Sequence, residues 1–127
     1  MVINTQAPAP AGTGGAIADG AWVLTAAKIW GSSAQEGSSS GMGAAQTWIV
    51  RGSMVDIVST TAKTKTVSRS SGTMTAAGTE LTLEQTCAYP ADAGLGASTT
   101  PFTATATTLL LYVPNGPGTF EFTYTKQ

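Results

Sequence analysis

The sequence predicts an all-β protein: an antiparallel up-and-down meander of about eight strands closed into a small barrel. The chain has 127 residues, only 10% of them charged, and 15 glycines. Thr is abundant while Leu, Glu, Lys and Gln are sparse, which favours strands over long amphipathic helices. Short runs of alternating apolar and polar residues are separated by turn residues. A long meander must close to protect its edges, and a β-sandwich of similar strand count is the alternative.

The expected strands follow the chain in order. The first is residues 21–29, after which a Ser- and Gly-rich loop is expected over 31–43. Three hairpins follow, each a strand, a short turn and a returning strand: 47–51 with 54–59, 72–76 with 80–86, and 102–105 with 108–113. A polar, edge-like strand is expected at 63–69, a long loop at 89–101, and the last strand at 119–126.

The three returning strands predict which side chains fill the barrel. Each carries two aliphatic residues two positions apart, and a period of two places such residues on one face of a strand. The six residues expected to face inward are Val55, Ile57, Leu81, Leu83, Leu109 and Leu111. Glu80 and Glu84 then face outward, which argues against a catalytic carboxylate pair. In the third hairpin, Leu110 and Tyr112 are expected to form an apolar stripe outside.

The chain divides into a leader and one domain. Residues 1–18 are rich in Ala, Pro and Gly and are expected to form a flexible leader, with residues 19–127 as the barrel domain. An intact signal peptide begins with basic residues followed by an apolar stretch. The leader lacks this pattern, so we do not expect it to be an intact signal peptide. Leaders of this kind often follow a removed signal or lipid-anchoring segment, and an ordinary disordered terminus is the alternative.

Four aromatic residues are the candidate ligand-binding set. Trp30 and Trp48 flank the loop at 31–43, and Tyr89 and Phe102 flank the loop at 89–101. If both loops lie at one barrel mouth, these rings suit a sugar or an apolar ligand. The alternative is that the rings only plug the core.

Composition excludes several kinds of chemistry. The chain has a formal net charge of −1, no His and one Cys, so a strong nucleic-acid binder, a His-based catalytic or metal site and an intrachain disulfide are not expected. No apolar run is long enough to span a membrane. We expect no enzyme activity, no cofactor and no metal. Cys87 is expected on the face of Leu81, Leu83 and Gln85 as a partly buried, inert thiol, with an intermolecular disulfide or a reactive thiol as the alternative.

Both ends of the domain resemble a known family. Gly20-Ala21-Trp22 resembles the Gly-x-Trp opening of the lipocalins and wider calycin barrels, and Lys126 stands where their last strand is followed by a basic residue that packs over this Trp. The layout from Gly20 to Lys126 is similar to a small bacterial lipocalin-like domain. The resemblance implies a structural closure made by Trp22 and Lys126 and a secreted or cell-envelope location, with lipid anchoring as one form of it.

Two functions follow as hypotheses. The first is a non-enzymatic lipocalin-like module that binds a small apolar or sugar ligand, or a protein partner, through the loop-bearing mouth. The second is a structural or self-assembling surface protein that uses the barrel as a building block, because a surface with little net charge tends to associate.

Overall fold

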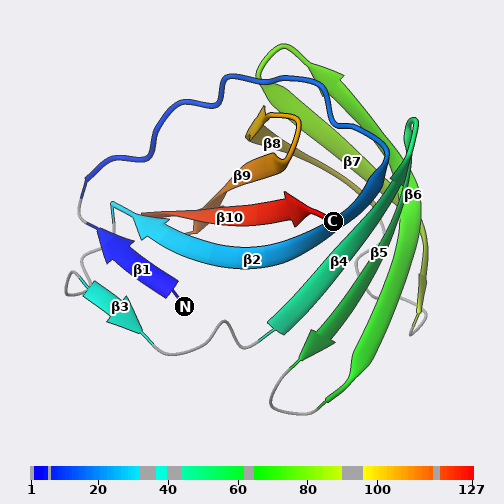
Figure 1. The fold of residues 1–127 in the computed structure, drawn as a ribbon, viewed down its shortest axis with the longest axis horizontal. Helices are drawn as coiled ribbons and strands as arrows, with labels where there is room; N and C mark the ends of the chain where they lie inside the picture. Colours follow the sequence, from blue (N-terminus) through cyan, green and yellow to red (C-terminus); the bar gives the residue numbers. More distant parts are fainter. Residues whose placement is uncertain are drawn as a thin grey trace.

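The structure, a computed structural model, describes residues 2–5, 7–31, 37–39, 44–61, 65–89, 96–115 and 118–127. These residues form strands and connecting segments and contain no helix (Figure 1). The strands are β1 (Val2–Thr5), β2 (Gly20–Trp30), β3 (Gly37–Ser39), β4 (Ala44–Arg51), β5 (Met54–Thr61), β6 (Val67–Ala77), β7 (Glu80–Tyr89), β8 (Gly96–Ala104), β9 (Thr108–Asn115) and β10 (Gly118–Lys126).

Eight of these strands form a closed antiparallel barrel, which confirms the predicted fold class. The order β2, β4, β5, β6, β7, β8, β9, β10 is a meander in which each strand pairs with the next, and β10 pairs with β2 to close it. The register partner of Lys126 is Trp22. The second half of the strand expected at 63–69 and the strand expected at 72–76 are one strand, since β6 runs unbroken from residue 67 to residue 77; residues 63 and 64 lie outside the described residues.

The core is formed by the inward faces that the alternation predicts. Trp22, Phe102 and Leu109 are fully buried, and the remaining core is Trp48, Val50, Val55, Ile57, Met74, Leu81, Leu111 and Tyr124, with Leu83 and Phe122 packed against it. Glu80 and Glu84 are exposed, as expected. Tyr112 lies on the outer face beside its register partner Glu121, but it is only 5% exposed, so the expected stripe is not open to solvent at this position. Burial raises the pKa of the Tyr112 phenol, which bonds to the Thr103 and Glu121 side chains.

The two ends of the barrel differ. At the closed end, two-residue turns join β4 to β5 and β6 to β7, with Gly52 and Gly78 at φ +61°. The other end, called the mouth here, carries the longer connections. Asp19 accepts a hydrogen bond from the Gly52 N–H at 2.7 Å at the closed end, and Ile17 packs against the core.

Residues 12–19, called the strap here, are bonded to the closed end. In Figure 1 the dark-blue chain arcs from β1 over the β8–β9 hairpin to the start of β2. Gly14 forms a parallel bridge with Thr103 and exchanges backbone hydrogen bonds of 2.8 Å with Phe102 and Ala104. A Cβ atom on Gly14 would lie 2.2 Å from the Gly78 carbonyl oxygen, so only glycine allows this approach. The expected division at residue 18 stays a prediction.

Two short strands lie beside the mouth end of β2 and were not expected from the sequence. β1 pairs in parallel with residues 27–30 of β2, and β3 pairs with the other edge of β1. β3 falls inside the segment expected as a loop. β4 pairs only with residues 20–23 of β2, so the two halves of β2 have different neighbours on this side.

The pairing between β8 and β9 is short and leaves the mouth half of this part of the wall unpaired. Their pairing covers only residues 102–104 and 109–111. The Phe102 N–H donates to Thr79, so by strand alternation the nitrogen of Pro101 faces β9. The same alternation turns the nitrogen of Pro114 toward β8. Neither proline has an N–H to continue the ladder, and the mouth-side half of β8 pairs with β7 alone.

Candidate functional site

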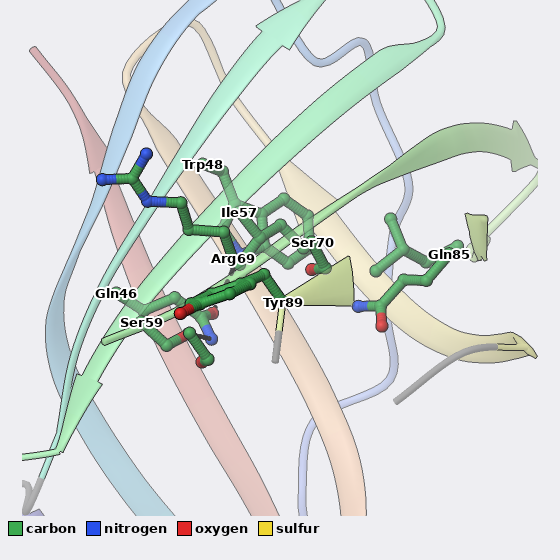
Figure 2. Close-up of a pocket in the computed structure, with 10 residues that line it drawn as sticks. Gln46, Trp48, Ile57, Ser59, Arg69, Ser70, Gln85 and Tyr89 are labelled. Atoms are coloured by element: carbon green, nitrogen blue, oxygen red, sulfur yellow. Dashed lines mark hydrogen bonds between the residues drawn. The ribbon is translucent and has the colours of Figure 1, made fainter. Parts of the chain in front are cut away.

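A pocket of about 320 Å³ lies in the mouth half of the barrel, between β4, β5, β6 and β7 (Figure 2). Its volume is within the range of small-molecule sites. Two aromatic side chains, two amides, three serines, one arginine and two aliphatic side chains line it: Trp48, Tyr89, Gln46, Gln85, Ser59, Ser68, Ser70, Arg69, Ile57 and Leu83. The lining is therefore aromatic and polar, with aliphatic contacts toward the core.

Gln46 is the centre of a hydrogen-bond network in this pocket. Its Oε1 accepts a bond from the Trp48 indole N–H at 2.8 Å and a second from the Tyr124 hydroxyl. Its Nε2 donates to the Ser59 hydroxyl oxygen at 2.8 Å. Three neighbours thereby fix which end of the amide is oxygen and which is nitrogen.

Tyr124 contacts this network from the core of the barrel. It is 3% exposed, and burial raises the pKa of its phenol far above the usual value, so the hydroxyl stays protonated as a donor. Its ring centroid lies 5.1 Å from that of Trp48 at an angle of 45°. The pair buries the polar network against an aromatic floor.

The remaining polar side chains have no partner among the described residues. The structure gives no hydrogen bond there to the side chains of Ser68, Ser70 or Gln85, so their donors and acceptors are free to meet a ligand. Arg69 and Tyr89 are register partners on β6 and β7. Tyr89 is 69% exposed, so its ring lies at the edge of the pocket.

Of the four predicted aromatic residues, the structure brings two together. Trp48 and Tyr89 both line the pocket. Phe102 is fully buried beside Gly12 and Thr79 at the closed end, away from the mouth. Trp30 lies at the mouth end of β2 but on the outer face of the wall.

A β-bulge explains the position of Trp30. Inward-facing Tyr124 and Phe122 pair with Leu24 and Ala27, so β2 has one extra residue between them. The extra residue reverses the alternation, and Trp30 points outward. There its indole N–H donates to Glu121 at 3.2 Å, and the Lys28 ammonium lies 3.9 Å from the ring centroid.

The alternation of β4, β5 and β7 also marks the polar lining residues. Gln46 precedes Trp48 by two positions, Ser59 follows Ile57 by two, and Gln85 follows Leu83 by two. Extending each inward alternation toward the mouth places all three in the pocket. The inward face therefore extends beyond the aliphatic pairs and includes these polar residues.

The predicted closing pair is aligned at the closed end. Trp22 and Lys126 are register partners, and the Trp22 indole N–H donates to the Ala18 carbonyl at 2.9 Å. The Lys126 stem lies against Gly20, because a Cβ atom there would stand 2.9 Å from its Cε. The proposed contact between the ammonium and the indole stays a prediction.

Cys87 lies on the outer face, so the expected partly buried thiol is wrong. A bulge on β7 pairs Gln85 with Gly72 and Cys87 with Ser71, leaving Thr86 unpaired between them. Leu81, Leu83 and Gln85 remain inward, whereas Cys87 is exposed.

A smaller cavity of about 280 Å³ lies at the closed end between the strap and β6 and β7, lined mainly by Ile17, Met74 and Leu81 with small residues. In the part of the chain that the structure describes, no group of three or more His, Cys, Asp or Glu is placed to hold a metal ion. That part also contains no helix of the length and hydrophobicity needed to cross a membrane.

Comparison with known proteins gives no match. No protein-family model, curated protein or solved structure is similar enough to this chain to be reported. The pocket itself is therefore the feature that points to a function.

Proposed function

We propose that this protein is a non-enzymatic binding module that takes a small saccharide in the mouth pocket. The proposal includes a lipocalin-like role for the barrel and a secreted or cell-envelope location. The closed meander and the Gly20–Trp22 opening support the first, and the charge-poor, hydroxyl-rich composition supports the second.

The observation that carries the proposal is the combination of residues in one pocket. Aromatic faces stack on the C–H surface of a sugar ring, and amides and hydroxyls bond to its hydroxyl groups. Trp48 and Tyr89 supply the rings, while Gln46, Gln85 and the three serines supply the polar groups. Amides and hydroxyls keep their protonation near neutral pH, which suits binding more than proton transfer.

The same lining favours a saccharide over an apolar ligand. An alkyl chain in this pocket would remove Ser68, Ser70 and Gln85 from water without replacing their hydrogen bonds, and each unsatisfied polar group costs about 1–3 kcal/mol. A hydroxylated ligand replaces those bonds instead.

The test is a titration followed by NMR of the backbone amides. Glucose, galactose, their uronic acids and N-acetylglucosamine are the saccharide probes, and decanoate is the apolar probe. We expect at least one saccharide to shift the backbone amide resonances of residues around Ser59, Ser70 and Gln85, and the shifts to saturate as the sugar is added. Decanoate binding there while no saccharide binds would overturn it.

A matched pair of variants on β7 locates the binding. Gln85 faces the pocket and its neighbour Glu84 faces solvent. Gln85→Ala should weaken the bound saccharide about tenfold through lost hydrogen bonds, whereas Glu84→Ala should leave affinity unchanged. Equal effects of the two variants would contradict a site inside the barrel.

Self-assembly is the second candidate, favoured by exposed apolar side chains at the mouth. Val67 is 42% exposed and Tyr89 is 69% exposed, and they lie with Arg69 around an outer hollow. Light scattering over a range of concentrations separates the two candidates. A monomer at all concentrations, with and without residues 1–18, contradicts assembly.

A further inference from the structure

The hydrogen bonds on the side of the pocket formed by Gln46 and Ser59, called the pocket floor here, run in one direction. Tyr124 donates to Gln46 Oε1, and Gln46 Nε2 donates to the Ser59 oxygen. Trp48 occupies the same Oε1 with its indole N–H. With Oε1 taken twice, Gln46 has one N–H left over, and Ser59, already accepting, has its own O–H left to donate.

The pocket lining therefore favours an acceptor at its floor. Ser68, Ser70 and Gln85 add further groups that can donate, and the Arg69 guanidinium places a positive charge at the mouth, outside the pocket. The described carboxylates lie elsewhere: Glu80 and Glu84 are exposed on β7, Asp56 bonds to Arg51 and Ser71, Glu121 bonds to Trp30, and Asp19 bonds to Gly52. None of them lines the pocket.

We infer that the preferred ligand of this pocket is an acidic sugar of the uronic acid class, whose carboxylate accepts hydrogen bonds from Ser59 and Gln46. The inference rests on the proposed function. A neutral hydroxymethyl group brings its own proton, for which the Gln46 Oε1 has no remaining place. A carboxylate brings only acceptors and takes bonds from several donors at once.

The sugar body then lies across the pocket. With its carboxylate at Ser59 and Gln46, the ring has Ser68, Ser70 and Gln85 in the same pocket for its hydroxyl groups and Tyr89 at the pocket edge. Arg69 lowers the cost of bringing a negative charge to the mouth. A phenol is protonated at neutral pH, and burial raises the pKa of Tyr124 further, so its hydroxyl remains a donor and the direction of the network holds.

Matched acid and neutral sugars test the inference. Calorimetric titration at pH 7 compares galacturonate with galactose and glucuronate with glucose. Hydrogen bonds to a charged acceptor are stronger than hydrogen bonds to a neutral one. In at least one pair, the acid should therefore bind at least about tenfold more tightly than the neutral sugar. Equal or weaker binding of both acids overturns the inference and leaves the saccharide site standing. Absence of binding by all four, and by the other saccharide probe, overturns the proposed function itself.

Variants at Ser59 test which side chain binds the carboxylate. Ser59→Ala removes the floor donor and should reduce the acid preference about tenfold while neutral-sugar binding changes less. Ser59→Thr keeps the hydroxyl and should retain the preference. Thermal unfolding checks that both variants are folded. If the preference for the acidic sugar is unchanged in both Ser59→Ala and Gln46→Glu, the carboxylate does not bind at Ser59 and Gln46, and the assignment is overturned.

Discussion

Gly72 lies so close to Glu84 that a Cβ atom at position 72 would stand 1.9 Å from the Glu84 carbonyl oxygen. The two residues flank the bulge where β7 gains one residue relative to β6. The bulge turns Cys87 outward while Leu83 and Gln85 remain in the barrel. One glycine therefore helps determine which side chains of β7 reach the pocket.

Gly72→Ala should destabilise the protein by about 3 kcal/mol, because the methyl group overlaps backbone atoms that have little room to move. Chemical denaturation gives the free energy of unfolding. Gly78→Asn is the control: nothing lies within 4 Å of a Cβ atom at this turn, and Asn tolerates its φ of +61°. A Gly72→Ala variant as stable as this control would contradict the close approach of β6 and β7.

The tryptophans on the two faces of β2 should differ in their contribution to stability. Trp22 is fully buried, so Trp22→Ala should lower the free energy of unfolding by about 3–5 kcal/mol through a cavity and a lost hydrogen bond. Trp30 lies outside with its bond to Glu121, so Trp30→Ala should lower it by about 1 kcal/mol. If denaturation measurements show a larger loss of stability for Trp30→Ala than for Trp22→Ala, the assignment of Trp22 to the core is contradicted.

The Asp56 carboxylate should make stability depend on acid pH. A hydrogen bond from Ser71, a second from Arg51 and the Arg51 charge together lower its pKa below 3.8. A group whose pKa is lower in the folded state stabilises the protein above its unfolded pKa, and this contribution is lost as pH falls through the folded value.

Asp56→Asn should therefore reduce stability at pH 7 and flatten its decline below about pH 4. The pair is solvent-exposed, so the effect is expected to stay under about 1 kcal/mol. Denaturation of both proteins between pH 2 and pH 7 measures it. Parallel curves with a constant offset would show that the carboxylate does not titrate differently on folding.

The Cys87 thiol should react in the folded protein. Its side chain is exposed on the outer face of β7, so a thiol reagent such as Ellman's should label one equivalent without denaturant. Labelling that begins only after unfolding would mean that the alternation of β7 continues past Gln85 without the bulge.

Alternation predicted the barrel well because a period of two depends only on local geometry. It placed Val55, Leu81 and Leu109 correctly, while the pairing of the first and last strands followed from the need of a long meander to close. It was wrong wherever a strand gained a residue, at Trp30 and at Cys87, because nothing in Thr25 or Thr86 marks either as the extra residue of a bulge. The β1 and β3 pairings depend on tertiary contacts and leave no comparable periodic signal.

The candidate site was predicted by its aromatic residues more than by its polar ones. Trp48 and Tyr89 were placed at the mouth by their flanking loops. Gln46 and Ser59 share the inward face by the same alternation, but their bond depends on the register between β4 and β5. That register comes from the turn at Gly52, which the sequence marks only as a turn.

Closure between β2 and β10 sets a kinetic constraint on the molecule. The hydroxyls of Thr25 and Thr125 meet 100 positions apart in the chain, whereas each hairpin joins close neighbours. Such a long loop gains its contacts only after its ends have been brought together, so folding by this topology is slow, on the order of milliseconds to seconds. Until then β2 and β10 are free edges able to pair with another chain, and the interval before closure is when this protein is most exposed to aggregation.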